Sequence, residues 1–303
     1  MVSTGHTKFR SPEVRVPQML SLPTIVLIAG LLLFCIPTML FVVQDTWTGE
    51  EGAHGPIVLF TGLWLLHRRW QEARHFRRVP PAGPIWVALA FLITLQIFAR
   101  ITQIVELEGY LMYAVLLVVL YSVIGMEAMK LLWFPLFYLA FVFPPPDTVV
   151  AAVTVPMKMV LSEAAIRFLS LFSYPIVGEG VRIYIGQYEL LVEAACSGIN
   201  SILSLTAISL FYIYMRHQAN WRYALLLVLF IVPVALVANF FRVLILILLT
   251  YHLGEAAGQG FLHNFAGVAM FAIALGVIFG LDELLKPVWD RHFGHLDRTT
   301  AHA

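Results

Sequence analysis

The stretch YALLLVLFIVPVALVANFFRVLILILLTY, residues 223–251, decides the fold of this chain. A membrane-spanning helix needs about 20 mainly apolar residues, and this run exceeds that length with a single charged side chain, Arg242. The whole sequence shares this character: 60% of its 303 residues are hydrophobic and only 12% are charged. A soluble domain has about 25% charged residues. We therefore predict an all-α polytopic membrane protein.

Outward from this run, seven further apolar segments also predict spans. The eight expected transmembrane helices cover approximately residues 20–43, 55–67, 84–103, 109–126, 131–143, 196–215, 223–251 and 264–285. The second and fifth are short, and the fifth ends at Pro144-Pro145-Pro146, which cannot continue a helix. The polar N-terminal residues predict no cleaved signal peptide. The expected organisation is a tail over residues 1–19, one integral membrane domain over 20–285, and a tail over 286–303.

The distribution of basic residues predicts the orientation. With the N-terminus in the cytoplasm, the cytoplasmic segments hold all but five of the 19 lysines and arginines, while most acidic residues fall outside. The exceptions are Arg100, Lys158, Arg167, Arg182 and Arg242. The positive-inside rule then places both termini in the cytoplasm. A net charge of +1 argues against a nucleic-acid partner, which would need a basic face.

The main extracytoplasmic insert is predicted over residues 144–195. Within it, residues 150–173 predict an amphipathic helix near the membrane interface. Residues 181–192 predict a short β-hairpin, because β-branched and aromatic residues flank a Gly186-Gln187 turn. The hairpin leads the chain directly to Cys196.

Three polar residues fall near the predicted outer face, where polar groups in spans are functional candidates. Cys196 opens the sixth span within EAACSGIN, residues 193–200. Arg242 lies in the outer half of the seventh span, about 13 Å of helix before its end. His263 opens the eighth span.

These residue types suit acyl transfer through a thioester. A helix N-terminus and a nearby cation lower the pKa of a thiol from about 8.5, so Cys196 is the candidate nucleophile and Arg242 the cation. His263 can accept the thiol proton or protonate a leaving amine. Arg242 can hold a developing oxyanion or a substrate carboxylate.

Other residues are alternative or supporting candidates for the same site. Cys35, inside an apolar run, is expected to be a small hydrophobic residue, and His252 competes with His263 as the base. Arg242 could instead extend its head toward the lipid headgroups. The candidate supporting groups around the site, which could equally be structural, are Glu193, Ser197, Asn200, Asn239 and Asn264.

Three short motifs resemble the exosortase/archaeosortase family of polytopic membrane cysteine transpeptidases. They are Ala195-Cys196-Ser197-Gly198-Ile199, Asn239-Phe240-Phe241-Arg242 and His263-Asn264-Phe265-Ala266-Gly267. The resemblance covers roughly residues 60–285 and is sharpest over 188–270. The family pattern has an acidic residue after the histidine, where this chain has Asn264.

The resemblance implies a function. Cys196 would be the nucleophile, His263 the general acid/base and Arg242 the stabiliser, with no metal or organic cofactor. The substrate would be an exported protein with a C-terminal sorting signal made of a Pro-Glu-Pro-like motif, a membrane helix and a basic tail. The enzyme would pass the acyl group to an acceptor of unknown identity at the outer face of the bacterial inner membrane.

Three rival functions remain open. An intramembrane cysteine hydrolase would use the same thiol with water as the acceptor. A small-solute transporter would place Arg242 and His263 on its pathway, although the sequence shows no inverted repeat. A structural subunit of an export complex would carry out no chemistry.

Overall fold

The computed structural model describes residues 22–47, 54–143, 145–180, 182–191, 198–217, 221–254 and 261–300. Its helices and strands are α1 (Leu22–Val42), η1 (Val43–Trp47), α2 (Gly55–Ala73), η2 (Arg74–Phe76), α3 (Ala82–Thr102), α4 (Val105–Leu131), α5 (Trp133–Leu139), η3 (Ala140–Val142), α6 (Asp147–Ser170), β1 (Ile176–Glu179), β2 (Arg182–Ile185), β3 (Tyr188–Leu191), α8 (Gly198–Arg216), α9 (Trp221–Leu253) and α11 (Phe261–Thr300). The predicted all-α polytopic membrane fold is confirmed.

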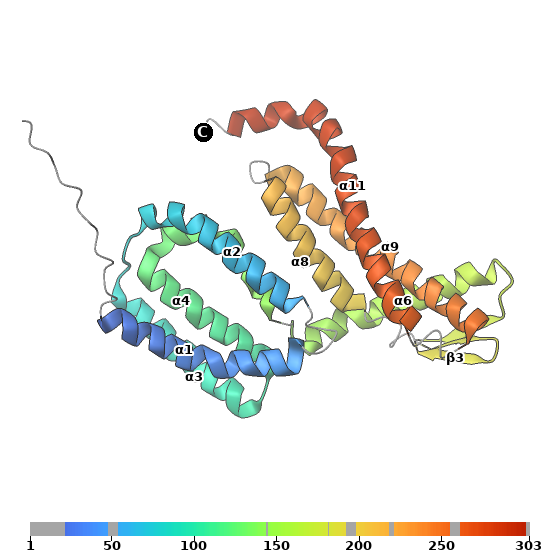
Figure 1. The fold of residues 1–303 in the computed structure, drawn as a ribbon, viewed down its shortest axis with the longest axis horizontal. Helices are drawn as coiled ribbons and strands as arrows, with labels where there is room; N and C mark the ends of the chain where they lie inside the picture. Colours follow the sequence, from blue (N-terminus) through green and yellow to red (C-terminus); the bar gives the residue numbers. More distant parts are fainter. Residues whose placement is uncertain are drawn as a thin grey trace, which may run out of the picture.

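Within the residues that the structure describes, six helices are long and apolar enough to cross a membrane. They contain the segments Ile25–Val42, Ala82–Thr102, Glu106–Leu131, Thr148–Ser170, Arg222–Leu253 and Val268–His292, and two shorter apolar helices cover Trp133–Val142 and Leu203–Arg216. Helix α2, predicted as a short span, is not among the six. Helix α6, predicted as an interfacial helix, has the length and composition of a span and crosses α9 at the end that carries the sheet (Figure 1).

The helices form two groups (Figure 1). In the first, α3 and α1 pack on α4, and α2 packs on α5. In the second, α9 packs between α8 and α11, and α6 and the sheet lie against its C-terminal half. Aromatic side chains connect the two groups: Phe134 of α5 stacks on Tyr214 of α8 with ring centroids 3.7 Å apart.

A glycine breaks helix α4. Gly125 has φ 79° and ψ 176°, a backbone conformation essentially limited to glycine, and the backbone N–H of Arg78 donates to the carbonyl of Ile124 at 3.1 Å. A Cβ at position 125 would lie 2.0 Å from the Arg78 carbonyl oxygen. The predicted end of the fourth span, residue 126, therefore coincides with a real change of backbone direction.

The described part of residues 144–195, the predicted insert, contains a three-stranded antiparallel sheet in the order β1-β2-β3. The predicted hairpin is confirmed as β2 and β3, with Ile185 paired to Tyr188 across the turn. Gly186 has φ 58°, the left-handed conformation that a tight two-residue hairpin requires. The sequence did not predict β1, whose Gly178 leaves room for Ile166 of α6, 2.3 Å from where a Cβ would be.

Candidate functional site

Arg242 lies on a buried face of α9. It is 8% exposed, and Asn239, one turn earlier on the same face, is 5% exposed. Ala235 continues this face and packs in one cluster with Leu205 of α8 and Ala274 of α11. The guanidinium-bearing face of α9 is therefore the face turned toward α8 and α11, the helices that follow the Cys196 motif and contain the His263 motif.

A buried carboxylate fixes the relative height of these three helices. Asp282 of α11 has 0% exposure and accepts hydrogen bonds from Tyr223 of α9 at 2.9 Å and from Tyr212 of α8 at 2.6 Å. Each bond joins a point on one helix to a point on another at the same level. The heights of residues on the three helices can therefore be compared by counting residues from these two hydrogen bonds.

Counting along the chain brings Arg242 and His263 to one level. Arg242 follows Tyr223 by 19 residues, and His263 precedes Asp282 by 19 residues. At about 1.5 Å per residue, each backbone position lies about 28 Å from these hydrogen bonds. The first residue of α8, Gly198, lies about 21 Å from Tyr212 by the same measure, and Cys196 precedes it by two residues in the sequence.

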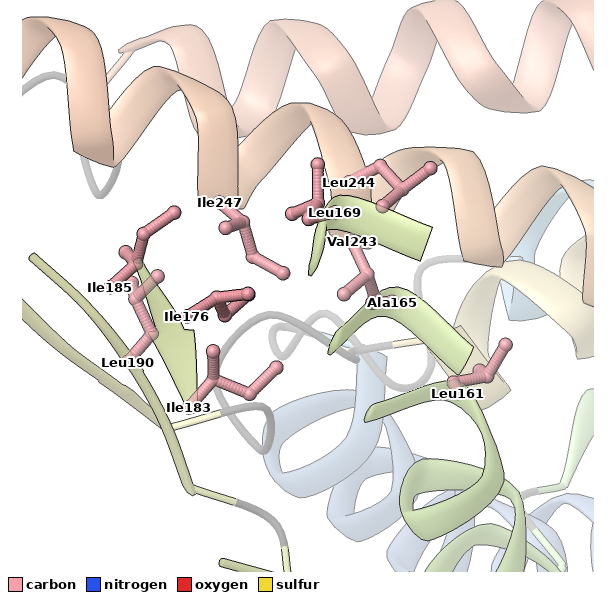
Figure 2. Packing of buried hydrophobic residues seen from close by; sticks show 10 residues of the cluster. All are labelled: Leu161, Ala165, Leu169, Ile176, Ile183, Ile185, Leu190, Val243, Leu244 and Ile247. Atoms are coloured by element: carbon pink, nitrogen blue, oxygen red, sulfur yellow. The ribbon is translucent and has the colours of Figure 1, made fainter. Parts of the chain in front are cut away.

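Strands β2 and β3, which precede Cys196 in the sequence, pack against α9 beside Arg242. Figure 2 shows Leu190 of β3 and Ile183 of β2 gathered with Val243 and Ile247 of α9 in one buried cluster. Val243 directly follows Arg242 in the sequence, so the sheet packs on the adjoining face of the same turn. Cys196 is five positions after Leu191 in the sequence, and five residues of fully extended chain span at most about 17 Å.

The structure describes only part of the predicted site. Cys196 and the candidate supporting residues Glu193 and Ser197 lie outside the described residues. The backbone of His263 lies in the first turn of α11, together with that of Asn264, and the backbone of Asn200 lies in the first turn of α8. Asn239 and Arg242 are described with their side chains and share one buried face.

His252, the competing candidate for the base, has a different environment. Its side chain is exposed, and its Nε2 lies 3.2 Å from the hydroxyl of Tyr174, which precedes β1. It is also 10 residues beyond Arg242, about 15 Å along α9. His252 is therefore exposed and distant from the buried face of α9 that carries Arg242.

Cys35 also has the environment expected of a structural residue. It is half-buried in α1 and packs against the apolar cluster that includes Met112 and Tyr138. A thiol among apolar neighbours lacks the cation and the polar surroundings that favour thiolate. The structure thus supports its interpretation as a small hydrophobic residue.

Most basic residues that depart from the charge asymmetry have acidic partners. Arg167 lies 2.5 Å from Glu163 and Arg182 lies 3.4 Å from Glu189, both pairs being exposed. Arg100 lies 4.0 Å from Glu108, whose side chain is 5% exposed. These pairs offset the positive charge locally.

The sequence prediction missed the polar cluster around Asp282. In addition to the two tyrosines, the Nε2 of His217 lies 2.9 Å from Asp282 Oδ1, and the Nε of Arg216 lies 3.2 Å from Oδ2. A carboxylate inside the eighth apolar run was a usable signal, because charged groups in spans are rare and usually paired. The cluster lies at the end of the bundle opposite the sheet, so we assign it to the packing of α8, α9 and α11.

Comparison with known proteins identifies a family. A family model described as transmembrane exosortase matches residues 46–280. The match begins before α2, extends through the first half of α11, and includes the sheet and all three motif segments. A search of curated proteins and of solved structures found no match to this chain.

Proposed function

Because the chain belongs to the transmembrane exosortase family, we propose that it is a membrane-embedded cysteine transpeptidase with Cys196, Arg242 and His263 at its centre. The family has a membrane transpeptidase or protease role and acts on exported proteins. The proposal adds the identity of the reacting residues and the type of substrate signal.

The observation that supports this proposal best is the position of Arg242. A buried guanidinium is costly within a span, and here it lies on the face of α9 that is turned toward α8 and α11. The backbone of His263 is at the same level as Arg242 when residues are counted from the polar cluster around Asp282. An arginine placed only to reach the lipid headgroups would need an exposed, lipid-facing position, whereas Arg242 is 8% exposed.

The proposed reaction has two transfers at one carbonyl carbon. The Sγ of Cys196 attacks the carbonyl carbon of the scissile peptide bond while His263 accepts the thiol proton. His263 then gives this proton to the departing amine, which leaves with the C-terminal membrane helix, and a thioester remains. Arg242 stabilises the negative charge on the carbonyl oxygen. A nucleophile from the acceptor attacks the thioester, its proton passes to the thiolate through His263, and Cys196 is restored.

The proposed substrate is an exported protein with a C-terminal signal made of a Pro-Glu-Pro-like motif, a membrane helix and a basic tail. Such a signal is anchored in the bilayer, and its cleavage site emerges at the outer interface. The proposed location, implied by the family, is the bacterial inner membrane. Charge asymmetry supports an orientation with both termini in the cytoplasm and the reaction on the periplasmic side.

The test is to co-express the protein with a substrate carrying this signal and to follow removal of its C-terminus. Wild type is compared with Cys196→Ala, Cys196→Ser, Arg242→Ala and His263→Ala, and Cys35→Ala is the matched control. We expect processing by wild type and Cys35→Ala and loss of processing in the other variants. Normal processing by Cys196→Ala would exclude the cysteine mechanism.

Mass spectrometry of the new C-terminus separates transfer from hydrolysis. A modified C-terminus identifies transfer to an acceptor and supports the transpeptidase. A free carboxylate on all of the product would replace the transpeptidase with the hydrolase, because water would then be the acceptor.

A further inference from the structure

A cavity of about 550 Å³ lies between the two helix groups, at the end of the bundle opposite the sheet. Residues from α2, α4, α5, α8 and α9 line it, and the stacked rings of Phe134 and Tyr214 are part of its wall. Its size is typical of ligand sites, which are about 300–1,000 Å³. The proposed reaction does not use this space, and the polar cluster around Asp282 reaches it only at His217, which is part of the cavity wall.

One side of the cavity wall is basic. Arg69 of α2 and Lys130 of α4 line it, with side chains 23% and 65% exposed. Each also pairs with a glutamate on its own helix, Glu72 at 2.8 Å and Glu127 at 2.9 Å. Both glutamates are more than half exposed, and among the described residues no acidic side chain lines the cavity. The exposed Lys130–Glu127 pair is worth little. The Arg69 guanidinium also lies 6.0 Å from the centroid of the Tyr214 ring, and its five donors can serve a second anion.

The rest of the wall is apolar and open to the side. Trp133 and Phe137 of α5 and Leu225 of α9 line the cavity and are 62%, 49% and 51% exposed. Leu225 lies in an apolar helix long enough to cross a membrane, and we expect these exposed apolar side chains to contact lipid. Trp133 beside Lys130 has the composition of a membrane interface, where tryptophan lies at the level of the headgroups.

We propose that this cavity binds an anionic phospholipid. The phosphate lies between Arg69 and Lys130, and an acyl chain enters the apolar part between α5 and α9. Basic pockets between transmembrane helices on the cytoplasmic side suit such headgroups, and the charge asymmetry predicts that this end faces the cytoplasm. The lipid fills the space between the two helix groups and connects them. This proposal does not depend on the proposed reaction.

The test measures lipid binding to the purified full chain in detergent. Phosphatidylglycerol and phosphatidylcholine are added in parallel, and the thermal midpoint and the bound lipid are followed by fluorescence and native mass spectrometry. The double variant Arg69→Gln/Lys130→Gln removes the positive charge of the cavity wall. Ala224→Phe fills the cavity and leaves both basic residues in place. Arg74→Gln is the control, because Arg74 is exposed and lies outside the cavity wall.

We expect phosphatidylglycerol to bind and raise the thermal midpoint more than phosphatidylcholine. The double variant should bind it about tenfold to thirtyfold more weakly, since each basic residue near an anionic surface is worth about fivefold. Ala224→Phe should also lose the selective effect, and Arg74→Gln should keep it. Equal effects of the two lipids, or wild-type binding by the double variant, would overturn the proposal.

A cross-linking measurement tests the other plausible occupant. A photoreactive residue at position 225 should capture phosphatidylglycerol in a bilayer. If it instead captures a synthetic membrane-spanning peptide with a basic tail, and captures no lipid, the cavity receives a protein helix and the lipid proposal is wrong.

Discussion

Tyr223 on α9 donates a hydrogen bond to Asp282 on α11, with 2.9 Å between the tyrosine oxygen and Oδ1 of the carboxylate. The same hydroxyl lies 3.0 Å from the backbone carbonyl of Asp282. A one-turn slide of either helix would move these groups about 5.4 Å apart. The pair therefore fixes the register of α9 and α11, and with it the common level of Arg242 and the His263 backbone.

Removing this hydroxyl should reduce stability. For Tyr223→Phe we expect the free energy of unfolding to fall by about 1–2 kcal/mol, between the values typical of interhelical hydrogen bonds in membranes and of bonds to charged acceptors. Thermal unfolding in detergent measures the change. Tyr184→Phe is the control, because its hydroxyl bonds to the exposed Glu189 at 3.4 Å, and it should have less than half the effect. Equal midpoints for Tyr223→Phe and wild type would contradict the register assignment.

The break in α4 should tolerate no side chain. In Gly125→Ala the new Cβ would lie 2.0 Å from the carbonyl oxygen of Arg78, and φ 79° is strained for alanine. We expect a loss of more than about 2 kcal/mol of stability and lower yield of folded protein. Gly276→Ala is the matched control, because nothing lies within 4 Å of its Cβ, and alanine in a helix is about 1 kcal/mol more favourable than glycine. A stable, well-expressed Gly125→Ala would show that the backbone break is not required.

Local signals in the sequence predicted much of this fold. The predicted span 223–251 lies within α9, Trp221–Leu253, and the predicted span 84–103 closely matches α3, Ala82–Thr102. Apolar length and flanking charge are properties of one segment, so they need no knowledge of neighbouring helices. The Gly186-Gln187 turn was predictable for the same reason, because glycine alone favours φ 58° there.

Contacts between distant segments were not predictable. Tyr223 and Asp282 are 59 residues apart in the sequence, and neither residue type identifies its partner. Strand β1 forms only because β2 is beside it, since it has four residues and a glycine. For the candidate site, the sequence identified Arg242 as a costly charge in a span. The face of α9 that carries it became clear only from the packing of Ala235 against α8 and α11.

His54 should make stability depend on pH. It is 5% exposed next to α2, and burial lowers its pKa below the ordinary 6.5 although a hydrogen bond to the backbone of Phe141 opposes this. The folded state therefore favours the neutral ring, while the unfolded chain binds a proton at higher pH. The contribution of neutral His54 to the free energy of unfolding is complete above about pH 6.5, and it is lost as the pH falls toward the folded-state pKa.

The measurement is the thermal midpoint in detergent from pH 7.5 to 5. Wild type should lose stability over this range, and His54→Gln should lose less, because glutamine can donate to the Phe141 carbonyl and does not titrate. His75→Gln replaces an exposed histidine and should follow the wild-type curve. Parallel curves for His54→Gln and wild type would exclude His54 as a source of the pH dependence.

Arg242 should be needed for the reaction more than for the fold. We expect Arg242→Gln to lower the rate of substrate processing by about 10²–10³-fold, the usual effect of removing one group that stabilises an oxyanion. Its thermal midpoint should stay the same or rise, because a buried charge in a span is costly. Arg242→Lys keeps the charge but loses the planar fork, so it should recover only part of the rate.

Arg182→Gln is the control, because Arg182 is exposed and pairs with Glu189 at 3.4 Å, and it should change the rate less than twofold. A variant Arg242→Gln that unfolds at a lower temperature and regains full processing when cooled would show that Arg242 supports packing and has no part in the reaction.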